Sequence, residues 1–217
     1  MKSREKIFIW GAGGHGRVLL NILRERKEYQ VIGFIDNDPK LKNKIIDGVK
    51  VIGDETVLPL LKKRGVKAGI AGIGDNQKRC QIAHHIKERG FSLINAIDLK
   101  SIIVPNVLLG EDVTIWAGTV INAHAKIGDN TIINCGAIIE HECIIGNGVH
   151  IGPGAKLAGR VKIGENAFVG IGTTVIEGRQ IGKNSIIGAG AIVLSDIPDN
   201  VVAVGVPAKI IKKLKNK

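Results

Sequence analysis

Three histidines, His124, His141 and His150, lie in a stretch that otherwise holds mainly aliphatic, small and turn-forming residues. His141 is the most distinctive, because it stands between two carboxylates in the run Glu140-His141-Glu142. An imidazole can take a proton from a nucleophile near neutral pH, and a neighbouring carboxylate raises its basicity and selects its tautomer. The run therefore predicts His141 as a general base and Glu142 as its partner.

A glycine-rich run, GAGGHG at 11–16, could bind an anion. It follows the apolar segment 7–10 and matches the G-x-G-x-x-G pattern, in which backbone N–H groups approach a diphosphate at a helix N-terminus. Asp36 lies twenty residues after Gly16, at the end of a second apolar segment, where a carboxylate can accept hydrogen bonds from a ribose or a base. A tight strand–helix turn that binds no ligand is the alternative interpretation.

The elements around this run indicate a small α/β domain. Strand-like segments at 7–10, 31–35, 68–73 and 91–97 alternate with helix-like segments at 18–26, 55–64 and 77–89. This order predicts a parallel sheet with helices on its faces, a Rossmann-like domain over residues 1–97. The run IGDN at 73–76 is expected to line the crevice at the carboxyl ends of the strands. So short a domain lacks the second half of a dinucleotide fold, which favours one nucleotide over NAD.

The second half of the chain has a period of six. From Ile103 to Val193 an aliphatic residue recurs at every sixth position, sixteen times in succession. A period of six fits neither a helix nor a flat strand. It predicts coils of three short strands, eighteen residues per circuit, with the aliphatic side chains inside and small residues at the corners. Residues 98–217 are therefore expected to form a parallel β-helix with a C-terminal segment and a basic tail.

Five segments of this chain resemble those of hexapeptide-repeat sugar O/N-acyltransferases of the sialic-acid O-acetyltransferase type. They span nearly the whole sequence: GAGGHG at 11–16, FIDNDP at 34–39, IGDN at 73–76, EHEC at 140–143 and GVPAK at 205–209. Within that family, the chain looks most similar to UDP-4-amino-sugar and perosamine N-acetyltransferases. The resemblance implies a left-handed β-helix, a homotrimer, and acetyl-CoA bound between neighbouring prisms.

The resemblance also implies roles for individual residues. The residues that hold the nucleotide of the sugar substrate would be Gly13, Gly14, His15, Asp36, Asn37 and Gly74. Asn134 would lie near the reacting sugar. The residues that contact acetyl-CoA would be His150, Gly159, Ile171, Pro207, Ala208 and Lys209. Asp36-Asn37 stands where UDP-sugar members carry two acidic residues, so the base stays open among uracil, thymine and guanine.

The spacing of the histidines predicts their relative positions. His150 lies half a circuit after His141, so the two would face different clefts on one prism and meet only across a subunit boundary. His124 lies one circuit before Glu142, so these side chains are expected to stack about 4.8 Å apart on adjacent coils. His124 would then either tune the catalytic pair or be structural. An oxyanion donor is also required, and a backbone amide near Gly159 is the candidate.

Composition sets the class of partner. The formal charge is +11, with five lysines in the last nine residues, and aromatic residues make up 3% of the chain. A basic chain could bind nucleic acid, but so few aromatic side chains for stacking on bases disfavour it. Nucleotide sugars and coenzyme A are also anions and account for the positive charge equally well. The sequence shows no membrane span and no signal peptide, so a cytoplasmic protein is expected. Its three cysteines are expected to be reduced, with Cys143 serving packing.

The expected activity is acetyl transfer from acetyl-CoA to the 4-amino group of a nucleotide-linked amino-dideoxy sugar, by direct attack of the amine on the thioester. Three alternatives remain open. An O-acetyltransferase acting on sialic acid would share the scaffold. A zinc enzyme resembling β-helix carbonic anhydrases would need three histidine ligands, and the spacings of seventeen and nine residues do not resemble that family, so no metal is expected. A non-catalytic β-helix scaffold or polyanion-binding protein is the third.

Overall fold

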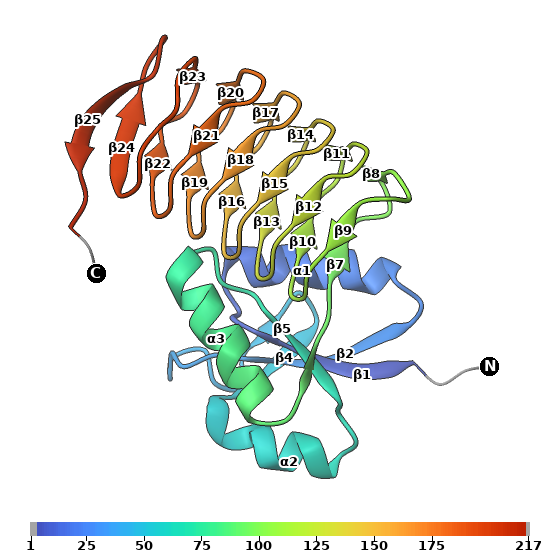
Figure 1. The fold of residues 1–217 in the computed structure, drawn as a ribbon. Helices are drawn as coiled ribbons and strands as arrows, with labels where there is room; N and C mark the ends of the chain where they lie inside the picture. The colour runs from blue at the N-terminus through green and yellow to red at the C-terminus, as the bar shows by residue number, and fades with distance from the viewer. Residues whose placement is uncertain (1–3, 216–217) are drawn as a thin grey trace. The chain divides into compact units, whose positions relative to one another are not determined.

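The computed structural model describes residues 4–215, and the chain divides into two compact units between Ala96 and Ile97 (Figure 1). The division falls one residue before the boundary expected from the sequence. Across residues 4–215, no helix is both long enough and apolar enough to cross a lipid bilayer.

The first unit is built on a six-stranded sheet in the order β3-β4-β2-β1-β5-β6. Its strands are β1 (Glu5–Trp10), β2 (Tyr29–Ile35), β3 (Ile45–Ile46), β4 (Val49–Gly53), β5 (Ala68–Ala71) and β6 (Ser92–Leu93). All neighbouring strands are parallel except β3 and β4, which form an antiparallel hairpin. Residues 7–10 of β1 are buried on both faces, as a parallel sheet covered on both sides requires.

Helices cover this sheet. They are α1 (Gly14–Glu25), α2 (Leu58–Lys63) and α3 (Asn76–Glu88), with a 3₁₀ turn, η1 (Glu55–Val57), before α2. Leu61 of α2 and Ile86 of α3 pack with Phe8 and Trp10 of β1 in one apolar cluster. Helix α1 lies on the other side of the sheet from α2 (Figure 1). The predicted Rossmann-like α/β unit is therefore confirmed.

Two local predictions differ from the structure, and one element was missed. The predicted helix at 55–64 is a 3₁₀ turn followed by the short α2, because Asp54 accepts a hydrogen bond from the Thr56 amide and Pro59 stands at the start of α2. The predicted strand at 91–97 is two strands, since its last two residues pair within the β-helix instead. The β3–β4 hairpin was not predicted.

The second unit is a left-handed parallel β-helix, as predicted (Figure 1). Each of the sixteen positions of the six-residue series is the second residue of a two-residue strand, from β8 to β23. Fourteen of these side chains are buried in one continuous core, and the first two, Ile103 and Leu109, are partly buried. From β8 to β20, each strand pairs with the strand eighteen residues later, as Ile138 pairs with Lys156.

Three sheets form the sides of this prism. Sheet 1 contains β7 (Ala96–Ile97), β10 (Thr114–Ile115), β13 (Ile132–Ile133), β16 (His150–Ile151), β19 (Phe168–Val169), β22 (Ile186–Ile187), β24 (Val201–Val204) and β25 (Lys209–Lys213). Sheet 2 contains β8 (Ile102–Ile103), β11 (Val120–Ile121), β14 (Ile138–Ile139), β17 (Lys156–Leu157), β20 (Thr174–Val175) and β23 (Ile192–Val193). Sheet 3 contains β9 (Leu108–Leu109), β12 (Lys126–Ile127), β15 (Ile144–Ile145), β18 (Lys162–Ile163) and β21 (Gln180–Ile181).

The chain turns each corner of the prism through a residue with positive φ, and the three corners use different residues. The glycine corner, between sheets 1 and 2, consists of Gly118, Gly136, Gly154, Gly172 and Gly190. The asparagine corner, between sheets 3 and 1, consists of Asp112, Asn130, Gly148, Asn166 and Asn184. The histidine corner, between sheets 2 and 3, consists of His124, Glu142, Arg160 and Gly178. Glutamate and arginine rarely adopt this conformation, which is disfavoured for residues with a Cβ.

The chain ends in a hairpin on sheet 1. Strand β25 pairs antiparallel with β24, and all five of its residues are exposed. The segment 205–208 connects the two strands, with Gly205 at φ 98° and a cis peptide bond between Val206 and Pro207. Lys209, Lys212 and Lys213 thus belong to an ordered strand rather than to a free tail.

Candidate active site

His141 and Glu142 lie at the histidine corner, in the turn from β14 to β15. The Nδ1 atom of His141 is 3.2 Å from Oε2 of Glu142, and both side chains are about half exposed. Because a carboxylate can only accept a hydrogen bond, this contact places the proton of a neutral imidazole on Nδ1. Nε2 then keeps a lone pair and can accept a proton.

The imidazole rests against the next coil at Gly159. A Cβ atom built on Gly159 would lie 2.6 Å from both Cε1 and Nε2 of His141. Gly159 stands one circuit after His141 and does not need a glycine for its φ angle. The missing side chain therefore leaves room for the ring rather than relieving the backbone.

Arg160 extends this pair into a chain of charges. Its Nη1 atom is 3.8 Å from Oε2 of Glu142, and its Nη2 atom donates to Oε1 of Glu177 on the following coil. His124 and Glu142 occupy the same corner on adjacent coils, as predicted, and the His124 ring contacts Asn106 on the preceding coil. A positively charged guanidinium attracts the carboxylate more strongly than a histidine does, so Glu142 turns toward the following coil.

Asn134 and His150 form a second group, on sheet 1. Nδ2 of Asn134 is 3.4 Å from Nε2 of His150, and the His150 ring packs edge-on against Phe168 with the ring centroids 5.0 Å apart. Oδ1 of Asn134 accepts a hydrogen bond from the amide of Cys135, and the Asn134 side chain is nearly buried. These contacts fix the orientation of both polar side chains.

One chain does not bring these two groups together. His150 is on a strand of sheet 1, whereas His141 is at the corner opposite that sheet, between sheets 2 and 3. The exposed Ile171 lies at a third place, beside the glycine corner. The remaining predicted acetyl-CoA contacts, Pro207, Ala208 and Lys209, lie in and after the loop between β24 and β25, where the Ala208 amide donates to the Ile192 carbonyl.

The glycine loop has the geometry of a close strand–helix turn. Gly11 has φ 115°, and a Cβ on Gly16 would lie 1.9 Å from the Gly11 carbonyl oxygen, so no larger residue fits there. Gly13 and Gly14 instead face open space. Helix α1 begins after Gly13, its first backbone bond runs from the Arg17 amide to the Gly13 carbonyl, and His15 is half-buried in its first turn. The N–H groups of this turn can therefore meet an anion.

Asp36 connects this loop to the end of β2. Its Oδ2 accepts from the Ala12 amide at 2.8 Å and its Oδ1 accepts from the Asp38 amide at 2.9 Å. The carboxylate thus shapes the loop, and lone pairs remain on both oxygens for a hydroxyl or a base. Asn37 follows as an exposed residue in the bend.

A residue that the sequence analysis missed is Arg79 of α3, whose side chain is completely buried. Its guanidinium donates to the carbonyls of Ile73 and Gly74, both at 3.2 Å, and to Oδ1 of Asn76 at 2.9 Å. Arg79 therefore holds the 73–76 loop, in which Gly74 is exposed. An arginine in the first turn of a helix, directly after such a loop, is the signal that could have identified it.

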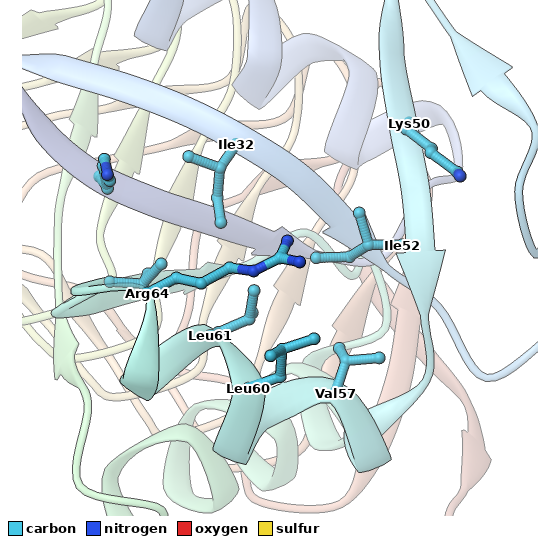
Figure 2. Close-up of a pocket in the computed structure, with 9 residues that line it drawn as sticks. Ile32, Lys50, Ile52, Val57, Leu60, Leu61 and Arg64 are labelled. Carbon is cyan, nitrogen blue, oxygen red and sulfur yellow. The ribbon is translucent and has the colours of Figure 1, made fainter.

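A cavity of about 400 Å³ lies elsewhere on the first unit. It has apolar walls that include Ile32, Ile52 and Leu61, and the Arg64 side chain extends over them toward Ile52 (Figure 2). Lys6, near the amino end of β1, also lines it, whereas the glycine loop follows the carboxyl end of that strand. No residue predicted to bind a substrate lines this cavity.

Cys143 follows Glu142 but is no candidate nucleophile. Its side chain is fully buried, its thiol donates to the Ala158 carbonyl, and burial raises the pKa of the Cys143 thiol to about 11. Within residues 4–215, no three histidine, cysteine or carboxylate side chains gather in a way that could hold a metal ion.

Both units match known families. The PglD N-terminal domain matches residues 6–86, and the bacterial transferase hexapeptide (six repeats) matches residues 124–159 and 160–195. A perosamine N-acetyltransferase from Caulobacter crescentus, solved with CoA and GDP-perosamine, is 42% identical with a TM-score of 0.92. That match covers 97% of this chain and 99% of the other.

Two further solved structures cover nearly the same span. The acetyltransferase domain of PglB from Neisseria gonorrhoeae FA1090, solved with acetyl coenzyme A, is 30% identical with a TM-score of 0.89, over 96% of this chain and 100% of that one. WeeI from Acinetobacter baumannii AYE, at 24% identity and a TM-score of 0.79 over 95% and 100% of the two chains, shares the fold. The chain therefore belongs to the hexapeptide-repeat sugar O/N-acyltransferases with a PglD-type N-terminal domain, and it is an acyltransferase.

Proposed function

We propose that the protein transfers an acetyl group from acetyl-CoA to the 4-amino group of a nucleotide-linked amino-dideoxy sugar. The observation that carries this proposal is the 42% identity, over 97% of the chain, to an enzyme solved with CoA and GDP-perosamine. The exposed His141–Glu142 pair supplies a group that can do the required proton transfer.

In the proposed reaction, Nε2 of His141 takes a proton from the sugar amine as its nitrogen attacks the thioester carbonyl carbon. The carbon–sulfur bond then breaks, and the protonated imidazole returns the proton to the departing CoA thiolate. Two structures of the perosamine enzyme carry a substituted histidine, which supports a histidine-dependent step. The Gly159 amide makes no hydrogen bond to any of residues 4–215, so it is available to stabilise the carbonyl oxygen as negative charge develops.

We further propose that the active enzyme is a homotrimer. On a single prism, sheet 1 with Asn134 and His150 faces away from the corner that holds His141. Side-by-side packing of prisms with threefold symmetry would bring sheet 1 of one subunit to the histidine corner of the next. Acetyl-CoA would then lie in the cleft between two prisms, against His150, Gly159, Ile171 and the 207–209 segment.

The first unit is the proposed nucleotide-binding part. The open Gly13 and Gly14, the helix N-terminus at His15 and the loop residue Gly74 offer backbone groups for a diphosphate. The Asp36 and Asn37 side chains would accept from the ribose or base.

A thiol-release assay tests the substrate class. Acetyl-CoA is supplied with UDP-, dTDP- and GDP-linked 4-amino-dideoxy sugars, with the free amino sugar, and with the matching 4-hydroxy nucleotide sugar. We expect CoA release only with amino nucleotide sugars. Release with the free sugar and with none of the nucleotide sugars would refute the nucleotide requirement, and release with the hydroxy compound would identify an O-acetyltransferase.

A complementation experiment tests the shared site. His141→Ala and His150→Ala subunits are co-expressed with different tags and purified as mixed oligomers. Each pure variant is expected to be nearly inactive. Every mixed trimer has roughly one interface in three that pairs two intact residues, so the purified mixed oligomers should recover about a third of wild-type activity. No recovery in verified mixed oligomers would place both histidines in one subunit's site.

A further inference from the structure

The histidine corner carries an arginine that protein stability does not explain. Arg160 has φ 61°, and the equivalent position of the next coil is Gly178. Holding a side chain in the left-handed region costs about 1–2 kcal/mol. The ion pairs that Arg160 makes are more than half exposed, and such pairs contribute about 0–1 kcal/mol. Glycine would therefore serve the fold at least as well as arginine.

The contacts of Arg160 point to the catalytic pair. The same oxygen of Glu142, Oε2, is 3.2 Å from Nδ1 of His141 and 3.8 Å from Nη1 of Arg160. The other terminal nitrogen of Arg160 binds Glu177, which stands in the same column as His141 and Gly159, two circuits after His141. A rigid guanidinium fork thus links the partner of the proposed base to the next coil.

We propose that Arg160 is a positioning residue that holds the Glu142 carboxylate against Nδ1 of His141. This inference rests on the proposed function. Without the guanidinium, the half-exposed Glu142 side chain can rotate into solvent, and the imidazole loses the partner that fixes its tautomer and ring plane. Other charged or titratable groups nearby have separate partners: Glu140 binds Asn122, and His124 contacts Asn106. Arg160 is thus the cation that contacts Glu142.

Steady-state kinetics of Arg160→Gln with acetyl-CoA and the best amino nucleotide sugar test the proposal. We expect kcat to fall about three- to fivefold while the KM for acetyl-CoA stays within about twofold, because the geometry of the base and not CoA binding is affected. Arg160→Lys should recover part of the loss by keeping the charge near Glu142. In a Glu142→Gln background, Arg160→Gln should cost little more, since its target is already gone.

Two controls separate this role from others. Arg179→Gln removes an arginine that pairs with Asp196 and should leave kcat within about twofold. Arg160→Gly should unfold at or above the wild-type temperature and yet lose turnover, as a purely structural arginine would not. An unchanged kcat in Arg160→Gln, or a rise confined to the KM for acetyl-CoA, would overturn the proposal. An active His141→Ala enzyme would instead refute the proposed base. The unfolding temperatures of Arg160→Gly and wild type would then still measure what Arg160 contributes to folding.

Discussion

Two corners of the β-helix share one backbone conformation and differ in most of the residues that adopt it. At the glycine corner five successive coils turn through glycine, and at the histidine corner three coils turn through His124, Glu142 and Arg160. The glycine corner shows that the positive-φ turn by itself prefers glycine. The histidine corner therefore retains about 1–2 kcal/mol of strain at each of its non-glycine turns. Strain of this kind persists where a specific side chain is used, as we propose for Glu142 and Arg160.

The difference also separates two uses of glycine. Gly118 occupies a turn that disfavours any Cβ, whereas Gly159 has an ordinary φ and meets the His141 ring where its Cβ would be. The first glycine serves the backbone and the second serves a neighbouring side chain. Substitutions at these corners should consequently affect stability and turnover separately.

The largest effect is expected for His141→Ala. Removing a general base lowers turnover by about 10²–10⁴-fold, and the half-exposed ring contributes little to the core, so the melting temperature should stay near wild type. The measurement is kcat from CoA release, beside circular dichroism during heating.

His124→Ala is the matched control on the preceding coil of the same corner. Its ring contacts Asn106 rather than Glu142, so turnover should change by no more than about threefold. If His124→Ala loses activity as severely as His141→Ala, the assignment of the base to His141 fails.

The next effect compares the two glycines. Gly159→Ala should displace the imidazole and lower kcat about 10–100-fold, since a misplacement of about 1 Å can have that effect. Gly118→Ala should instead destabilise the fold by about 1–2 kcal/mol, because its φ is 71°, and leave kcat unchanged. Kinetics and thermal unfolding of both variants check the pair.

A double variant tests whether Gly159→Ala lowers turnover by displacing the His141 ring. In a His141→Ala background, Gly159→Ala should reduce the remaining activity little further, because no ring is left to displace. A full additional loss would show that the new methyl group acts on CoA or on the backbone amide, and the packing argument would be wrong.

The sequence predicted the β-helix because the narrow interior accepts only an aliphatic side chain at each sixth position. It could not choose the partner of Glu142, since a period of eighteen places His124 and Arg160 symmetrically on either side. Charge could have identified Arg160 as the partner, because a carboxylate is attracted more by arginine than by neutral histidine. The residues of one chain also could not show how prisms pack, so the meeting of His141 and His150 stays a prediction.

In the first unit, the parallel strands and the glycine loop followed from apolar runs and a motif, whereas the β3–β4 hairpin did not. The sequence does contain a signal for this hairpin. Asp47-Gly48 joins Ile46 to Val49, both turn residues have positive φ, and Asp-Gly is a strong hairpin-forming pair. The buried Arg79 is harder to predict, because its partners are backbone carbonyls that only the folded loop brings together.

The smallest expected effect concerns the alkylation of two cysteines, one at the glycine corner and one at the histidine corner. Cys135 precedes Gly136 and is exposed, whereas Cys143 follows Glu142, is fully buried and has a thiol whose pKa is raised to about 11 by burial. At pH 8 only about one in a thousand Cys143 thiols is ionised, and the thiolate is the reactive form. Iodoacetamide should therefore modify Cys135 in the native protein and reach Cys143 only after unfolding, as peptide mass spectrometry would show. Because Cys143 serves packing, alkylation of the native protein should leave its unfolding temperature unchanged. Equal labelling of the two cysteines would mean that the histidine corner opens in solution. The packing of the His141 ring against Gly159 would then not be rigid.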